Sequence, residues 1–244
     1  MRETYYAGAY WGCRPESAEE CARRAETFFH LLSACHPSYA RWYEKHNSTK
    51  RALQLQFEPT FDTFVRFFGK KKYQMGKDGF YLGTWTGHVE QDQGGMVMLR
   101  CGSSAEVAPN SVLLHFPYED PGKERLFTLP VLTGVMRAMA LAWEPDVGVI
   151  VSGQFRDQMR QEEDRREFAG WLLYLSRDRG EVPSLPPPVR VEQVGDKGTI
   201  VILTPERLTA SSPEHLALGR HVQELLDEKN LLRPVLPLQP SQNS

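Results

Sequence analysis

Residues 4–11 read TYYAGAYW, and residues 16–32 read ESAEECARRAETFFHLL. The first run is aromatic and small without a polar interruption, which is typical of a buried β-strand. The second opens with a capping box, in which the Ser17 hydroxyl and the Glu20 carboxylate accept from free backbone N–H groups of the first helical turn. Apolar residues then recur at helical spacing, at positions 18, 21, 22, 25, 28, 29 and 32. The sequence therefore predicts a strand followed by an amphipathic helix that ends at His36-Pro37.

Apolar runs bounded by turn residues and apolar residues at helical spacing recur along the chain. They predict helices from Thr60 to about Lys71, from Thr128 to Trp143, over 154–178, and from Pro213 onward behind a Ser212 cap. They predict strands at 79–86, 95–101, 111–116 and 146–152, and a C-terminal hairpin of 189–194 and 199–203. Residues 38–58 fit neither pattern. The three middle strands are joined by loops too short for crossover helices, so we expect an antiparallel meander.

The fold class that follows is α+β: a mixed, mainly antiparallel sheet with packed helices and a C-terminal β-hairpin plus helix. A proline-rich run, PSLPPP at 183–188, predicts a stiff connector. We therefore expect a main domain over residues 1–180 and a hairpin-and-helix extension, residues 181–233, packed on it. Residues 234–244 are rich in Pro, Gln and Ser and are expected to form a disordered tail.

Composition narrows the class of protein and of partner. Hydrophobic residues make up 41% of the chain and charged residues 25%, a globular balance. The net charge of −2 argues against direct binding of nucleic acid. The four cysteines contain no CxxC pair, so neither a zinc site nor a disulfide scaffold is expected. With no signal-peptide pattern and no apolar run of membrane length, we expect a cytoplasmic protein without cofactor, metal or membrane partner.

Three features could carry catalysis, and each has a simpler structural explanation. Ser152 ends a predicted strand, but a nucleophile elbow also needs glycine two residues before the serine, and this chain has none there. His30, His36 and His46 are close in sequence without a motif that would bring them to one point. The charges of 157–167 alternate in sign, as on a solvent-exposed helix. The residues alone therefore indicate no catalytic, cofactor-binding or metal-binding side chains and predict a protein that is not an enzyme.

Three stretches, taken together, resemble a known family. They are YYAGAYWG at 5–12 running into ESAEECA at 16–22, WEPD at 143–146, and GWLLYL at 170–175. In this order and spacing the chain resembles immunity protein family fifty-two of bacterial polymorphic toxin systems, from about residue 4 to the final helix. As structure, WEPD is expected to end the third helix and turn the chain into the next strand, and GWLLYL to pack as a core helix.

The resemblance implies an α+β protein that is encoded beside a toxin gene and neutralises that toxin by binding it. The cognate toxin commonly carries a restriction-endonuclease-like DNase domain and is often delivered by a contact-dependent or type VI secretion route. The resemblance supplies no catalytic residue and no binding motif to carry over. Two alternatives stay open: an enzyme of another class, which would need convergent polar residues in a pocket, and a generic adaptor, which the neighbouring gene would distinguish.

Candidate toxin-binding residues follow from the electrostatics of a nuclease. A DNA-binding cleft is basic because it neutralises phosphates, and an inhibitor can cover it with carboxylates. A net charge of −2 excludes an acidic whole surface that mimics DNA, so the acids must be local. Loop acids without basic neighbours in sequence are Glu90 and Asp92, between two predicted strands, and Glu119 and Asp120, beside Pro121. Acids of this kind are equally common in ordinary solvated turns.

Overall fold

The computed structural model describes residues 3–88, 94–118, 122–160 and 166–236. Its strands are β1 Tyr5–Trp11, β2 Trp42–Glu44, β3 Gln56–Phe57, β4 Phe80–Trp85, β5 Met96–Cys101, β6 Asn110–His115, β7 Val147–Ser152, β8 Leu172–Ser176, β9 Arg190–Val194 and β10 Gly198–Ile202. Its α-helices are α1 Ala18–Cys35, α2 Thr49–Ala52, α3 Phe61–Phe68, α4 Gly122–Leu126, α5 Leu129–Trp143, α6 Gly153–Met159 and α7 Pro213–Asp227. Four short 3-10 helices are η1 Pro37–Tyr39, η2 Lys71–Tyr73, η3 Gly76–Asp78 and η4 Arg177–Arg179.

The described strands form one sheet in the order β3-β2-β4-β5-β6-β1-β7-β8-β10-β9. Each pairing between them is antiparallel. The predicted α+β class is confirmed, as are the meander of β4, β5 and β6 and the hairpin of β9 and β10. The hairpin joins the sheet through β8, and α7 follows it. No helix in the described ranges is long and apolar enough to cross a membrane.

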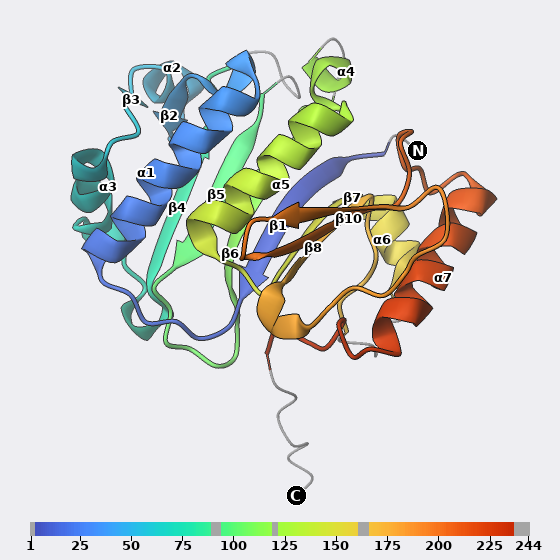
Figure 1. The fold of residues 1–244 in the computed structure, drawn as a ribbon. Coiled ribbons are helices and arrows are strands. Elements are labelled where there is room, and N and C mark those ends of the chain that lie inside the picture. Colours follow the sequence, from blue (N-terminus) through green and yellow to red (C-terminus); the bar gives the residue numbers. More distant parts are fainter. Residues whose placement is uncertain (1–2, 89–93, 119–121, 161–165, 237–244) are drawn as a thin grey trace, which may run out of the picture.

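One layer of helices covers one face of this sheet. Helices α1 and α5 lie side by side across it, and α3 packs on α1 (Figure 1). The core lies between this layer and the strands. Trp11 of β1 stacks on Trp143 of α5 with ring centroids 5.5 Å apart, and Phe29 of α1 meets Trp42 edge-on at 4.9 Å. Because an aromatic side chain buries about 150–250 Å², these contacts join the layer firmly to the sheet.

A smaller pair of helices lies toward the other face. Arg156 of α6 is placed over the ring of Tyr6, 5.9 Å from its centroid, and Tyr6 points away from α5. Helix α7 packs on α6, where Gly219 leaves room for Phe155 and Met159. This pair therefore covers the β1–β7 region and stays at one end of the sheet.

The predicted beginning of the fold is confirmed in detail. Residues 5–11 form β1, and α1 starts with the capping box: the Ser17 hydroxyl accepts from the Glu20 amide at 3.2 Å, and the Glu20 carboxylate accepts from the Ser17 amide at 2.7 Å. The helix ends at Cys35, before Pro37. The predictions for α5, β7 and α7 are confirmed as well, and the Ser212 hydroxyl caps α7.

The predicted helix over 154–178 is wrong. Helix α6 ends at Met159, and residues 172–176, expected to pack as a core helix, form β8. Leu172 to Leu175 are all buried, and β8 lies in the interior of the sheet, paired with β7 and β10. A strand of this kind is a continuous apolar run, whose periodicity does not differ from that of a buried helical segment.

Two further boundaries differ from the prediction. Helix α3 ends at Phe68 instead of Lys71, because Gly69 caps it and Lys70 takes extended backbone angles. The unassigned residues 38–58 contain η1, β2, α2 and β3, elements of two to four residues that are too short to show a period. The predicted tail lies outside the described residues from position 237 onward.

Candidate functional site

The strands β4, β5 and β6 present an apolar surface on the side of the sheet away from α1 and α5. Along each strand buried and partly exposed residues alternate. The buried residues, such as Leu82, Leu99 and Leu114, belong to the core. The partly exposed ones, together with two tyrosines of β1, form what we call the open face: Tyr6, Tyr10, Tyr81, Gly83, Trp85, Met96, Met98, Arg100, Ser111, Leu113 and His115.

The strand register arranges the open face in rows. Trp85 pairs with Met96, Met96 with His115, and His115 with Tyr6, which gives one continuous row across four strands. Residues directly opposite each other on antiparallel strands have Cβ atoms about 4.5–5.5 Å apart, so their side chains touch. The row is therefore a band of aromatic and thioether groups with one imidazole.

The next row has glycine at both ends. Gly83 and Gly8 flank Met98 and Leu113 in register. A Cβ atom on Gly8 would lie 2.6 Å from the Tyr10 hydroxyl oxygen, so only glycine lets this ring fold over the strand. The glycines thus let side chains of neighbouring positions lie flat on the open face.

The side chain of Lys45 lies in the space left by Gly83. A Cβ atom on Gly83 would lie 2.9 Å from its Cδ atom, and its Nζ atom is 3.2 Å from the sulfur of Met96. Among the described residues Lys45 has no carboxylate partner. Burial lowers the pKa of His115, and the charge of Lys45 acts in the same direction, so the imidazole is neutral at neutral pH. Lys45 therefore contributes an unpaired positive charge lying on apolar groups.

At the β1 end the open face deepens into a hollow of about 290 Å³. Tyr6 and Tyr10 form one wall, and Phe168, Glu167, Arg156 and Arg160 contribute to the rest. Arg156 is held in place by Asp157, whose Oδ1 atom accepts from Nε at 2.9 Å and from Nη2 at 2.8 Å. Arg160 lies over the Phe168 ring, 5.8 Å from its centroid, and is exposed.

The ionisation of the groups in the hollow makes it a site for an acid. Burial raises the pKa of Tyr6 and of Tyr10, so both hydroxyls stay protonated and can donate. Burial also raises the pKa of Glu167, against the opposing effect of nearby Arg179 and Arg160. Arg160 has no ion pair with a described residue. Hydroxyl donors beside an unpaired guanidinium suit a carboxylate or a similar small acid group.

The WEPD motif forms a separate polar network that supports the fold. Glu144 ends α5 in a left-handed conformation, with φ 46°, and its carboxylate binds Arg24 at 3.1 Å and Lys197 at 2.6 Å. Arg14 donates to the Trp143 carbonyl at 2.7 Å. Basic side chains thus satisfy the free carbonyls at the C-terminus of α5, where they also suit the helix dipole. The WEPD motif therefore has a structural role.

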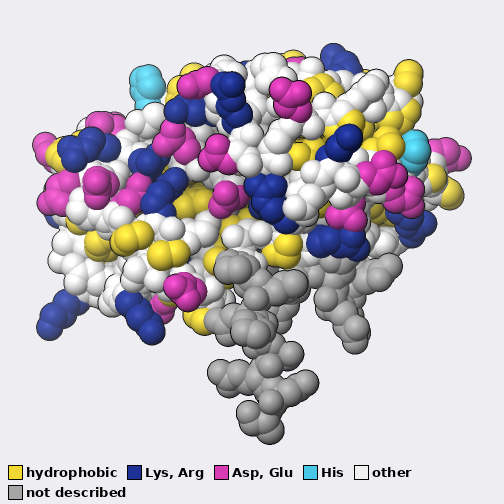
Figure 2. Space-filling model, turned by 60° about the horizontal axis from the view of Figure 1, so that its bottom comes forward, with side chains coloured by type: hydrophobic (Ala, Val, Ile, Leu, Met, Phe, Trp, Pro, Cys, Tyr) yellow, Lys and Arg dark blue, Asp and Glu magenta, His cyan; other side chains and the backbone are white. Residues whose placement is uncertain are grey.

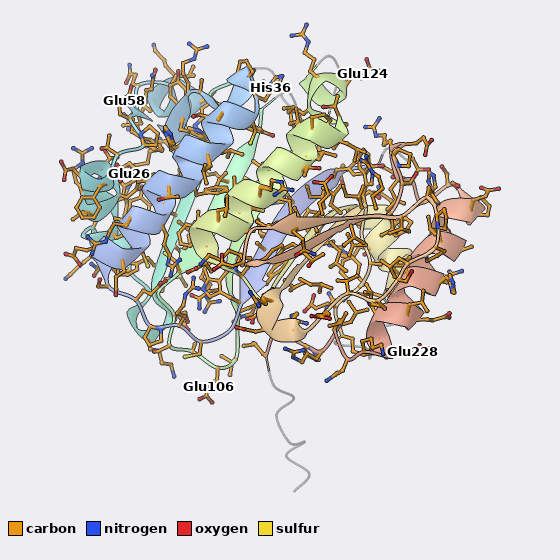
Figure 3. All side chains as sticks on the ribbon, viewed as in Figure 1. Glu26, His36, Glu58, Glu106, Glu124 and Glu228 are labelled. Atoms are coloured by element: carbon orange, nitrogen blue, oxygen red, sulfur yellow. The ribbon has the colours of Figure 1, made fainter. Side chains whose placement is uncertain are left out.

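Other side chains considered for catalysis also serve the backbone. The Ser152 hydroxyl accepts from the Phe155 amide at 3.1 Å and caps α6, and the His36 ring nitrogen accepts from the Ser38 amide at 3.2 Å. In the described part of the chain no group of three or more His, Cys, Asp or Glu is placed to hold a metal ion. His36 and five glutamates that Figure 3 labels lie apart on separate segments: Glu26, Glu58, Glu106, Glu124 and Glu228.

The four predicted toxin-binding acids lie outside the described residues: Glu90, Asp92, Glu119 and Asp120. The strand ends from which their segments depart are nonetheless neighbours, because Trp85 pairs with Met96 and Met96 with His115. Over the described residues visible in Figure 2, basic and acidic side chains are interleaved and no large area carries one sign of charge.

The sequence interpretation missed the open face and the hollow. A signal was present, because positions that should face solvent on the predicted strands hold Tyr81, Trp85, Met98 and Leu113 where polar residues are usual. The hollow had no such signal. Its residues come from β1, from α6 and from the segment before β8, which are far apart in sequence.

Comparison with known proteins gives the family. The model of the family described as Immunity protein 52 matches residues 3–235, nearly the whole chain. The chain belongs to the Immunity protein 52 family. No curated protein matches it. Among solved structures it is similar to Pseudomonas aeruginosa T6SS protein PA0821, with a TM-score of 0.54 and 10% sequence identity, over 99% of this chain and 77% of that one. At this identity the likeness concerns the fold.

The motifs that carry the Immunity protein 52 resemblance lie in the core of the structure. They fall in β1 and α1, at the junction of α5 and β7, and in β8. Trp11, Trp143 and Trp171 in these stretches are all buried. The motifs therefore specify an Immunity protein 52 scaffold, whereas the open face consists mostly of residues outside them.

Proposed function

We propose that this protein neutralises a cognate secreted bacterial toxin by binding it, in the cytoplasm and without catalysing a reaction. The observation that carries the proposal is the match of Immunity protein 52 to residues 3–235. The similar fold of PA0821, which is named as a T6SS protein, supports a toxin delivered by type VI secretion. The structure is consistent with such a role, since Ser152 and His36, two of the side chains considered for catalysis, act as backbone caps.

The toxin that we propose is a DNase with a restriction-endonuclease-like domain. The support is the sequence resemblance, in which such nucleases are the common partners. Glu90, Asp92, Glu119 and Asp120 remain our candidates for contacts with the basic DNA cleft of the toxin. A nuclease cleft attracts carboxylates for the same reason that it attracts phosphates.

The test uses the toxin domain encoded beside the gene for this chain. Expressed alone in a bacterial cytoplasm, that domain should stop growth, and co-expression of this chain should restore it. Purified toxin should cleave plasmid DNA, and cleavage should cease once this chain reaches an equimolar amount, because a binding inhibitor acts stoichiometrically. A toxin of an unrelated family, which this chain should leave active, is the control. Protection at far below equimolar amounts would instead indicate an enzyme, and no protection would refute the immunity role.

A further inference from the structure

We propose that the toxin docks on the open face, and that the matching toxin surface is apolar with carboxylates facing Lys45 and Arg160. The inference rests on the proposed function, because it names the contact surface and the partner chemistry of that activity. It is argued from the composition of the face, its rigidity, its charge and its hollow.

The open face has the composition of an interface core. Tyr, Trp, Met and Arg are enriched at protein–protein interfaces, and Tyr, Trp and Arg carry most of the binding energy. The open face contains each of these, and Tyr81 is 39% exposed. In a sheet with one face on the core, the other usually bears polar residues. Met98 and Leu113, side by side at its centre, depart from that rule.

The open face is also held rigid. Its rows lie on strands that are paired on both sides, with the α1–α5 layer packed behind them. A partner that binds here does not have to order the surface first, which lowers the entropic cost of association. Strands hold their side chains in place better than loops do, so the rows can serve as a template for a complementary surface.

The charge balance indicates the chemistry of the partner. Arg100 is paired with Asp78 at 3.1 Å, and Arg156 with Asp157 at 2.8 Å. Lys45 and Arg160, at opposite ends of the open face, have no ion-pair partner among the described residues. Among the described residues, Lys45 and Arg160 are thus two unpaired cations against the one buried carboxylate of Glu167 in the hollow, which leaves an excess of positive charge that carboxylates on a partner would neutralise. A second copy of this chain would bring the same excess, so like charges would oppose its binding.

The hollow provides the place for an anchoring side chain. Tyr6, Tyr10 and Phe168 form apolar walls, and Arg160 stands at the rim beside the tyrosine hydroxyls. An Asp or Glu of the toxin that enters it would gain a charge-assisted hydrogen bond while the aromatic walls exclude water. Because the hollow shares Tyr6 and Tyr10 with the open face, one partner surface can occupy both.

The experiment measures association of the full chain with the toxin domain encoded by the adjacent gene, by biolayer interferometry at several salt concentrations. Tyr81→Ala and Met98→Ala remove apolar contacts from the face. The control is Leu141→Ala, on the α5 side of the molecule, where Leu141 is 45% exposed and so matches Tyr81.

Lys45→Glu/Arg160→Glu reverses both unpaired charges. Its control is Arg190→Glu/Lys229→Glu, which makes the same charge change on exposed residues of β9 and of the segment after α7.

We expect each open-face variant to weaken binding by about tenfold or more, with unchanged melting temperature, and the controls to bind as the unmodified chain does. The double reversal should act mainly on the association rate and reduce its salt dependence. Normal binding by all open-face variants would overturn the inference and leave the immunity role intact, whether or not a control variant binds more weakly. Failure of the unmodified chain to bind the toxin would overturn the proposed function itself. A dimer of the unmodified chain that these variants dissociate, with toxin affinity unchanged, would assign the face to self-association and also overturn the inference.

Discussion

At the scale of single residues, Glu144 combines strained backbone with strong side-chain contacts. Its φ of 46° is unfavourable for a residue other than glycine, yet Arg24 and Lys197 bind its carboxylate. Both Glu144→Gly and Glu144→Ala remove the ion pairs, and only glycine also relieves the strain. We therefore expect the alanine variant to be less stable than the glycine variant by about 1 kcal/mol, measured by urea unfolding. Equal stability of the two would show that the left-handed conformation does not persist in solution.

Trp143 should contribute far more to the free energy of unfolding than the backbone conformation of Glu144 does. It is fully buried against Trp11 and Phe28. Trp143→Ala should lower the free energy of unfolding by about 3–5 kcal/mol, because a large cavity replaces the ring. Leu141→Ala, at an exposed position on the same helix, is the control and should change it by less than about 0.5 kcal/mol. An unchanged melting temperature of the Trp143 variant would contradict the packing described here.

Glu44 gives stability a dependence on pH. Burial opposes its ionisation, but hydrogen bonds from Lys72 and Tyr73 and the charge of Lys70 outweigh burial, so its pKa is lowered. A carboxyl with a lowered folded-state pKa stabilises the protein above its unfolded pKa of about 4.3 and loses that effect as the pH falls through the folded value. The stability difference between the unmodified chain and Glu44→Gln should be largest near neutrality and vanish in acid. A difference that stays constant with pH would exclude this ion pair as its source.

At the scale of elements, α1 depends on its first turn. The Ser17 hydroxyl satisfies an amide that no helical carbonyl reaches. Ser17→Ala should therefore cost about 1 kcal/mol of unfolding free energy, measured by denaturant titration. Ser33→Ala serves as the control, because this exposed hydroxyl bonds only to a carbonyl within the last turns of the same helix. Equal effects of the two substitutions would contradict the cap.

Helices and strands could be predicted from the sequence where residues close together in the chain determine where they begin and end. The capping box marked the start of α1, and Ser212-Pro213 that of α7, since caps are set by neighbouring residues. The identity of β8 depends on its pairing with β7 and β10, which the apolar run Leu172 to Leu175 does not reveal by itself. The apolar runs of β4, β5 and β6, separated by Gly, Asp, Pro and Asn, predicted the strands, but which face the helices would cover is a tertiary property.

At the scale of the whole molecule, the predicted loop acids give a test of charge complementarity. Reversal of Glu90 and Asp92, or of Glu119 and Asp120, to lysine should slow association with a nuclease toxin and flatten its salt dependence. Folding should survive, because surface substitutions usually change stability by no more than about 0.5 kcal/mol. Association rates by stopped flow would decide, with Glu181→Lys/Glu228→Lys, the same charge change at exposed positions elsewhere, as the control. If both reversals bind and protect normally, these acids are ordinary turn residues and the inhibitory contacts lie elsewhere.

The candidate site was harder to predict than the fold for a geometric reason. The hollow joins Tyr10 of the first strand with Arg160 and Phe168, residues about 150 positions later, and only the β1–β7 pairing brings them together. Local sequence patterns contain no information about such distant pairings. The scaffold motifs, by contrast, consist of neighbouring residues whose spacing is readable directly.

The central position of β1 in the sheet delays its pairing during synthesis of the chain. Ala7 pairs with Leu114 on one side and with Ile150 on the other, so β1 is synthesised before either partner and waits for both. At the usual rate of about 5–20 residues per second, the roughly 150 residues needed take about 8–30 s to make. A cell that meets an incoming toxin cannot shorten this interval. If the chain acts as we propose, molecules folded before an attack can therefore bind the toxin at once, whereas a newly started chain can do so only after this interval.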